Sequence, residues 1–244
     1  MRCSRWLAAL VLIAWGTWPS MGQTPSRPAA AGQLLPVAAS GAAAEALLQG
    51  ETAHWSQASA KKVALNRTPP LYDTDEPATA EIPVAEVRLL RSPGKLYVQL
   101  TWRDSTQDAA HLPAVPDSPP ETRFRMVQTE EEDRFFDAAA IMVPMKGTAA
   151  LYPSLQMGDT DHPVRIYYWN STRGAMLMEA QGRGTTKRTG LGFAANGSYH
   201  NGQWTVTFEL PAQPAGVPMA FAIWNGSQKD RDGRKYFSVW YTVE

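Results

Sequence analysis

The sequence predicts an all-β fold, an antiparallel β-sandwich with few short helices. Three observations support this: apolar and polar residues alternate in many short segments, turns rich in Pro, Gly and Asn separate them, and no segment keeps a long helical period. The clearest segment spans 202–210, in which alternate positions share one face. These positions are Trp204, Val206, Phe208 and Leu210. Many short strands joined by such turns typically form two packed antiparallel sheets.

The first half of the chain predicts a short strand followed by a hairpin. Trp55 is expected to tuck its side chain inward ahead of the strand at 62–65. The segments 82–90 and 95–102 alternate on either side of the turn 91–94, whose Pro and Gly suit a hairpin connection. We therefore expect these two segments to pair with one face buried.

The second half predicts further strands separated by polar loops. Strand composition recurs at 133–142 (after a short turn), 164–169, 219–224 and 236–243. The segment 111–121 is Pro-rich and is expected to be a loop. The segment 182–192 is rich in Gly and Thr, carries three basic residues and predicts a mobile loop.

The first 22 residues have the features of a secretory signal. Arg2 and Arg5 precede an apolar run at 6–15, and small residues at 20–22 suit cleavage. The run is shorter than the roughly 20 apolar residues that span a bilayer, which weighs against a retained membrane anchor. We therefore expect a periplasmic protein with no transmembrane span in the mature chain.

Behind the signal at 1–22, composition divides the rest of the chain into two parts. The segment 23–49 is rich in Pro, Ala, Gly and Ser and predicts a flexible leader. The remaining residues, 50–244, are expected to form one domain, because their length suits a single large all-β unit.

Cysteine content and charge exclude several classes of site. Cys3 is the only cysteine and lies inside the expected signal. The mature chain would then have no thiol for disulfides, iron–sulfur clusters or covalent haem attachment through Cys-x-x-Cys-His. The 23 basic and 23 acidic residues balance without a basic stripe, so nucleic acid is not an expected partner.

A series of landmarks follows one order along residues 50–244. They are the segments 55–58, 96–106, 133–138, 157–159, 164–169, 204–210 and 221–240. Together they resemble the b-haem subunit, called gamma, of periplasmic molybdenum enzymes of the dimethyl sulfoxide reductase family. Such subunits occur in ethylbenzene, dimethyl sulfide, selenate, chlorate and nitrite-oxidising or nitrate-reducing complexes. The joint order carries the resemblance, since no single motif is specific.

The resemblance implies an immunoglobulin-like or carbohydrate-binding-module-like sandwich that holds one non-covalent haem b. It implies Met157 and Lys235 as the two ligands of the haem iron, and a role in electron transfer without bond chemistry of the subunit's own. The implied partners are an iron–sulfur beta subunit and a molybdenum alpha subunit, with a soluble cytochrome c as external carrier.

The chemistry of both residues suits this role, although each has a more ordinary alternative. A thioether such as Met157 raises the haem potential, and Gly158 lets the backbone turn beside a flat macrocycle. Lys235 binds iron only as the neutral amine, which burial favours. The alternatives are a methionine that fills a core gap and a lysine exposed on a strand.

Other residues compete for the site. His162 and Lys229 are the rival ligands, although the first lies in an expected surface turn and the second in a polar loop. Candidates for pairing with haem propionates are Arg165, Arg183, Arg188 and Arg234, and the sequence does not choose among them. Aromatic residues that line either a cleft or the core are Trp102, Tyr168, Trp169, Trp224, Trp240 and Tyr241. The acidic run 130–133 fits a solvated face or a surface that steers a basic cytochrome.

A second functional hypothesis stays open. An aromatic-lined sandwich without haem could bind sugar or another apolar-faced ligand, as a carbohydrate-binding-like module does. A hydrolase is disfavoured because the sequence has neither a Gly-x-Ser-x-Gly nor a His-Glu-x-x-His motif.

Overall fold

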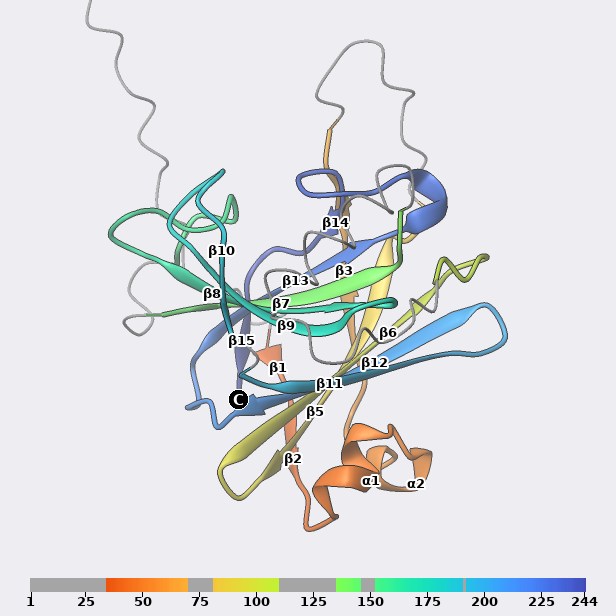
Figure 1. Cartoon of the computed structure of the whole chain (residues 1–244). Helices are drawn as coiled ribbons and strands as arrows, with labels where there is room; N and C mark the ends of the chain where they lie inside the picture. The colour runs from red at the N-terminus through yellow and green to blue at the C-terminus, as the bar shows by residue number, and fades with distance from the viewer. Residues whose placement is uncertain (1–33, 70–80, 110–134, 146–151, 191) are drawn as a thin grey trace, which may run out of the picture.

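Two stacked β-sheets form the protein in the computed structural model, which describes residues 34–69, 81–109, 135–145, 152–190 and 192–244 (Figure 1). The six-stranded sheet has the order β11 (Ala194–Tyr199), β12 (Gln203–Pro211), β6 (Lys95–Arg103), β5 (Val84–Ser92) and β2 (Val37–Ala39), with β3 (Lys61–Ala64) also on β5. The predicted all-β sandwich is confirmed.

The nine-stranded sheet forms the second layer. Its order is β1 (Leu34–Leu35), β15 (Tyr241–Val243), β13 (Pro218–Trp224), β7 (Ala138–Pro144), β8 (Val164–Asn170), β9 (Gly174–Ala180) and β10 (Lys187–Gly190). Off this path, β14 (Tyr236–Phe237) pairs with β13 and with β4 (Asn66–Arg67). Most pairs are antiparallel, but β1 with β15 and β2 with β5 are parallel, so both sheets are mixed.

The main core lies between the two sheets. The hairpin of β5 and β6 pairs Val87 with Leu100 and Leu89 with Val98, as the alternation of the sequence predicts. The alternate residues of β12 point into the same core and are fully or almost fully buried. Large apolar side chains from both layers therefore fill the interior and fix the register, because a shift by one residue would turn them outward.

Two short helices cover the outer face of the six-stranded sheet. They are α1 (Ala44–Leu48) and α2 (Thr52–Trp55). Leu47 and Trp55 pack on Leu90 and Tyr97, and the Trp55 indole N–H donates to the Leu47 carbonyl at 3.0 Å. The expected inward tuck of Trp55 is thus confirmed.

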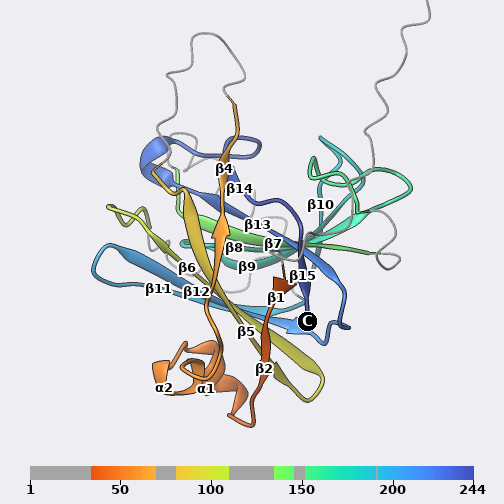
Figure 2. The ribbon, with the colours of Figure 1, turned by 180° about the vertical axis from the view of Figure 1, so that it is seen from behind.

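The segment from β3 to β4 passes from one sheet to the other. β3 pairs with β5 in the six-stranded sheet, whereas β4 pairs with β14 in the nine-stranded sheet (Figure 2). This crossing places Arg67 and Thr68 beside a loop more than 150 residues later in the chain.

A buried carboxylate joins the two layers. Asp137 accepts hydrogen bonds from the Gly226 backbone N–H at 2.9 Å, the Asp108 backbone N–H at 2.7 Å and the Trp204 indole N–H at 2.9 Å. Burial raises the pKa of Asp137 from 3.8 to about 7, although these donors oppose the shift. The start of β7, strand β12 and the loop after β13 are therefore held at one point.

Two expectations about loops are wrong. Residues 34–49, expected within a flexible leader, form β1, β2 and α1, because Leu35 and Leu47 are fully buried despite the small residues around them. The expected mobile loop 182–192 contains β10, which pairs with β9. The signal at 1–22, the loop 111–121 and the acidic run 130–133 lie outside the described residues.

Strand boundaries shift slightly, and some strands were not foreseen. The segment 236–243 divides into β14 and β15 around Ser238–Trp240. β9 and β11 were not expected from the sequence, because Met, Ala and Gly give their segments little β propensity. Both are placed by pairing with a strongly β-prone neighbour.

Candidate functional site

The outer face of the nine-stranded sheet carries a second apolar cluster. Its buried members are Ala138, Ala140, Tyr152, Val164, Ile166, Ala180, Ala220, Trp224 and Trp240. Met157, Tyr168 and Ala222 are among the partly buried residues packed on it. A sandwich sheet usually turns its outer face to water and carries polar side chains there. This face departs from that pattern.

Small side chains form the middle of this outer face. Ala140 on β7 lies opposite Ala222 on β13, Ala138 lies opposite Trp224, and Ala220 lies next along β13. Alanine leaves the backbone surface low and flat over two neighbouring strands. Such a floor suits contact with a planar apolar group, since larger side chains would hold the group away from the sheet.

Aromatic side chains border the alanine floor. Tyr168 packs edge-on against Trp224 with ring centroids 5.3 Å apart. Tyr152 packs against Trp240 at 5.9 Å, and the Trp240 indole N–H donates to the Pro153 carbonyl at 2.9 Å. The last contact ties the loop that carries Met157 to the sheet.

Met157 lies in a tight loop at one end of this face. Its φ is 75° and that of Gly158 is 72°, so two consecutive residues are left-handed. The Gly158 N–H donates to the Ser154 carbonyl at 2.8 Å, and the Gly182 N–H donates to the Met157 carbonyl at 2.8 Å. A left-handed methionine is uncommon and is strained unless the surroundings fix it. Here these hydrogen bonds fix it with the thioether side chain on the outer cluster.

Gly158 has a specific steric reason to be glycine. A Cβ added there would lie 2.5 Å from the His162 carbonyl oxygen and 3.1 Å from a methyl group of Val164. The loop therefore closes directly on the start of β8, which keeps Met157 beside the sheet.

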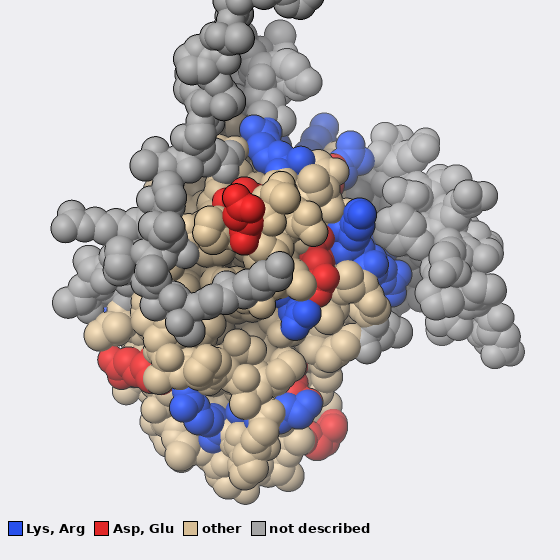
Figure 3. Space-filling model, turned by 90° about the vertical axis from the view of Figure 1, so that its left-hand side faces the viewer, with Lys and Arg blue, Asp and Glu red and all other residues tan. Residues whose placement is uncertain are grey.

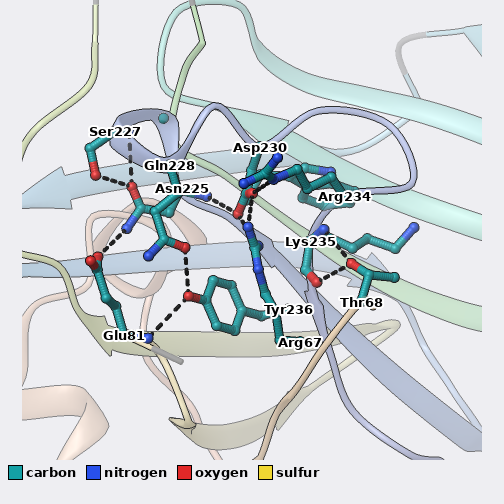
Figure 4. Close-up of polar contacts among 12 residues, drawn as sticks. Arg67, Thr68, Glu81, Asn225, Ser227, Gln228, Asp230, Arg234, Lys235 and Tyr236 are labelled. Atoms are coloured by element: carbon teal, nitrogen blue, oxygen red, sulfur yellow. Dashed lines mark hydrogen bonds and ion pairs between the residues drawn. The ribbon is translucent and has the colours of Figure 1, made fainter. Parts of the chain in front are cut away.

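Lys235 lies just before β14, at the other end of the face. The register of β14 on β13 pairs Tyr236 with Ile223, which places Lys235 beside Trp224. Its Nζ lies 5.2 Å from the centroid of the Trp224 ring and 3.4 Å from the Asp232 carbonyl oxygen. Figure 4 shows this side chain extending away from the ion pair of Arg67 with Asp230.

The surroundings of Lys235 lower the pKa of its amine. Burial lowers the pKa of Lys235, the Asp232 carboxylate opposes this, and the Arg183 guanidinium lowers the pKa further through like charge. Arg183 follows Gly182, the residue bonded to Met157. Met157 and Lys235 thus both contact the outer cluster, the first by packing on it and the second beside the Trp224 ring.

The rival ligands lie elsewhere. His162 is held in a turn, where its ring Nδ1 lies 3.0 Å from Asp159 Oδ1 and its side chain is 37% exposed. Lys229 is exposed in the polar loop and ends a short 3₁₀ turn.

The four candidate arginines differ in their contacts. Arg165 pairs with Glu179 at 2.7 Å, and Arg234 lies 3.6 Å from Asp230. Arg183 and Arg188 are exposed on and beside the β9–β10 hairpin. On the side shown in Figure 3, Lys and Arg are interspersed with Asp and Glu over a largely uncharged surface.

The aromatic candidates divide between the two faces. Trp102, Trp169 and Tyr241 belong to the core between the sheets, whereas Tyr168, Trp224 and Trp240 belong to the outer cluster. Neighbouring residues on one strand thus have different roles, as alternation requires.

Sequence reasoning missed the alanine floor and the residues around Lys235. The three consecutive alanines at 138–140 and the alanines at 220 and 222 were a readable signal of small side chains on these two strands. Arg67, Thr68 and Asp230 carried no local signal, because their partners are distant in sequence.

The described part of the chain contains no helix that is long and apolar enough to cross a membrane. Within the same residues, no group of three or more His, Cys, Asp or Glu side chains is placed to hold a metal ion.

The outer face carries side chains that could hold a flat, apolar, iron-centred cofactor. It combines a floor of alanines, aromatic borders, a soft thioether at one end and an amine with lowered pKa at the other. Both donors are compatible with a haem iron, and neither is a thiolate.

Comparison with known proteins identifies related subunits. The chain is 33% identical over 172 residues to a putative respiratory nitrate reductase heme subunit of Haloferax mediterranei, a match that covers 66% of this chain and 55% of the relative. It is 25% identical over 178 residues to chlorate reductase subunit gamma of Ideonella dechloratans, covering 68% and 66%. It is 28% identical over 172 residues to dimethylsulfide dehydrogenase subunit gamma of Rhodovulum sulfidophilum, covering 63% and 57%.

The matched region thus spans between about half and two thirds of each of these relatives. The model of the ethylbenzene dehydrogenase family matches residues 52–193, more than half of the chain. That segment includes β3 to β10, the floor of β7 and the Met157 loop. The chain belongs to the ethylbenzene dehydrogenase family.

Proposed function

We propose that this protein is a b-haem electron-transfer subunit in which Met157 and Lys235 would hold the iron of one haem. When bound, the haem supplies a one-electron carrier whose potential a methionine ligand raises. The subunit relays electrons and carries out no bond chemistry itself.

One observation carries the proposal: a thioether and a partly desolvated amine border the same apolar, alanine-floored sheet face. The two residues come from loops 78 positions apart in the sequence. The Met157 backbone is left-handed, which is uncommon for a non-glycine residue, and the Lys235 amine lies 5.2 Å from the Trp224 ring centroid at the edge of the same cluster.

The chain's own residues prepare both ligands. The apolar surroundings and the Arg183 charge lower the pKa of Lys235, so a metal ion would displace its proton more easily. The hydrogen bond from Gly182 and the tight fit at Gly158 keep the Met157 thioether on the face. The alanines and aromatic rings exclude water, which favours a cofactor bound without covalent attachment.

The relatives named above include gamma subunits of chlorate reductase and dimethylsulfide dehydrogenase, which supports a place in a multi-subunit complex. The resemblance given in the sequence analysis implies an iron–sulfur beta subunit and a molybdenum alpha subunit as partners. The signal-like residues 1–22 support a periplasmic location. The chain passes electrons between the iron–sulfur clusters of the beta subunit and an external carrier such as a soluble cytochrome c.

The test is spectroscopy of the exported chain produced with ample haem. We expect one haem per chain and, in the oxidised form, the near-infrared magnetic circular dichroism band of a methionine ligand. Met157→Ala should abolish this band and lower the midpoint potential. Lys235→Ala should leave the iron five-coordinate or open to another ligand.

Matched controls separate ligation from packing. Met178 is another methionine packed on the outer cluster, and Lys229 is an exposed lysine of the Lys235 loop. Met178→Ala and Lys229→Ala should keep the wild-type band. A protein that stays colourless would overturn the haem proposal and favour the ligand-binding module. Wild-type spectra from both Met157→Ala and Lys235→Ala would overturn the ligand assignment alone.

A further inference from the structure

The backbone of Lys235 is held by one residue from a distant part of the chain. Thr68 donates its backbone N–H to the Lys235 carbonyl at 3.0 Å, and its hydroxyl donates to the same oxygen at 2.5 Å. The Lys235 N–H in turn donates to the Thr68 hydroxyl at 2.7 Å. Both backbone polar groups of Lys235 are thus bound, which fixes where its side chain starts.

A buried ion pair holds Thr68 in reach of Lys235. Arg67 donates through both terminal nitrogens to Asp230, at 2.6 and 2.5 Å, and the two side chains are 8% and 0% exposed. The Arg67 guanidinium also lies 4.6 Å from the centroid of the Tyr236 ring. Such a bidentate pair fixes orientation as well as distance.

Asp230 also closes the loop that leads to Lys235. It accepts the Asn225 backbone N–H at 3.1 Å and lies near Arg234. The loop from Asn225 to Lys235 is therefore tied at its base to β4, as Figure 4 shows. Buried ion pairs contribute little net stability but can specify one arrangement, which is what a ligand loop requires.

None of these contacts involves the Lys235 amine. The clamp, which we define as Arg67, Thr68 and Asp230, binds backbone and loop atoms, while the side chain of Lys235 extends away from it toward Trp224. The clamp can therefore restrict the swing of the ligand without competing for its lone pair.

We propose that Arg67, Thr68 and Asp230 are positioning residues that hold Lys235 on the outer face and so oppose its exchange for external ligands at the iron. This inference rests on the proposed role of Lys235 as a ligand. It assigns a function to a segment, 67–68, that lies far from both ligands in the sequence.

Thr68→Val tests the clamp with little change of shape. The variant keeps the branched side chain and the backbone N–H but removes the hydroxyl. Tyr236→Phe is the matched control, because it removes the hydroxyl contacts of the neighbouring residue with Glu81 and Gln228 and leaves the Lys235 backbone untouched. Thr68→Ser restores the hydroxyl and should behave as wild type.

Two measurements give the expected result. In the haem-free chain, Thr68→Val should lose hydrogen-exchange protection at the Lys235 amide, whereas Tyr236→Phe should keep it. In the haem-loaded chain, imidazole should bind the oxidised iron of Thr68→Val roughly 10–100-fold more tightly than wild type, the usual size of effects from residues that orient metal ligands. Tyr236→Phe should stay close to wild type.

Lys235→Ala separates the possible failures. If Lys235→Ala binds imidazole no better than wild type, Lys235 is not a ligand of the iron, and the ligand assignment in the proposed function is wrong at that residue. If Lys235→Ala binds imidazole tightly but Thr68→Val matches Tyr236→Phe at equal thermal stability, the clamp is only structural and the positioning role is wrong.

Discussion

The two faces of the nine-stranded sheet differ in side-chain size although the same strands form both. On the inner face, Ile141, Tyr167 and Phe221 fill the space between the layers. On the outer face, the neighbouring positions on β7 and β13 are alanines, including Ala140 and Ala222. Large side chains fill the inner face, whereas small side chains form the middle of the apolar outer cluster, a combination suited to a bound planar group.

Because successive residues of a strand point to opposite faces, one strand can carry residues for stability on one face and residues for cofactor binding on the other. A substitution on the inner face should act on stability, and one on the outer face should act on cofactor binding. Substitutions on either face can test this division between stability and cofactor binding.

The inner face should show a large effect on stability alone. Ile141→Ala removes a fully buried side chain and should lower the free energy of unfolding by about 2–5 kcal/mol, because it leaves a cavity in the core. Urea unfolding of the haem-free chain measures this. Folded Ile141→Ala should still bind one haem per chain, and a loss of haem without a loss of stability would contradict the division.

Much of this fold could be read from the sequence, because its strands carry strong alternation. The hairpin of β5 and β6 and the strands β8, β12 and β13 are rich in branched and aromatic residues, and the structure has them close to the expected bounds. The helix α1 was missed because five residues are too short to show a helical period, although they are good helix formers. The strand β11 was missed because its Ala, Asn and Gly residues have little β propensity and its place depends on pairing with β12.

The site was less predictable, for a physical reason. Met157 and Lys235 were expected from the resemblance, and the structure places both on one face. The residues that hold them, such as Thr68, act through hydrogen bonds across 167 positions. No local pattern encodes such a contact.

The buried carboxylate of Asp137, just before β7, should make stability depend on pH. The folded pKa of Asp137 is raised from 3.8 to about 7 by burial, so its stabilising contribution is complete in acid below the unfolded pKa and is lost as pH rises through about 7. In Asp137→Asn, unfolding of the haem-free chain should therefore show a shallower fall in stability over this range.

Asp137→Asn should also lower the free energy of unfolding by an amount that does not depend on pH. An amide in place of the carboxylate cannot accept from the Gly226 N–H and the other donors at once, which should cost about 1–3 kcal/mol for an unpaired buried donor. An unchanged slope of stability against pH in Asp137→Asn would show that another group titrates there.

Backbone strain at the edge of the outer face should affect both stability and ligation. Gly158→Ala forces a Cβ against the His162 carbonyl at positive φ and should cost about 1–3 kcal/mol. The matched control is Gly184→Ala, whose φ is 76° but whose Cβ would meet no atom within 4 Å, so only the backbone cost of about 1–2 kcal/mol applies.

Only the Gly158 variant should change the methionine band of the oxidised protein, because it alone displaces the Met157 loop. Thermal unfolding and near-infrared magnetic circular dichroism measure the two effects. Equal losses of the band in both variants would show that the loop is set by general stability rather than by the contact at Gly158.

A substitution on the outer face should have the opposite effects to Ile141→Ala, with little change in stability and a clear loss of haem affinity. Ala222 is half-buried, and Ala222→Leu adds a branched side chain to the floor opposite Ala140 without opening a cavity. Stability of the haem-free chain should change by about 0.5 kcal/mol or less, the usual size for positions outside the core. Haem affinity should fall at least ~10-fold, equivalent to about 1.4 kcal/mol, because the larger side chain holds a planar group away from the sheet.

Haem titration followed by absorbance measures the affinity of Ala222→Leu, and urea unfolding of the same samples measures its stability. If Ala222→Leu lowered stability as much as Ile141→Ala while haem affinity stayed at the wild-type value, the outer face would be an ordinary part of the core and the floor would lie elsewhere.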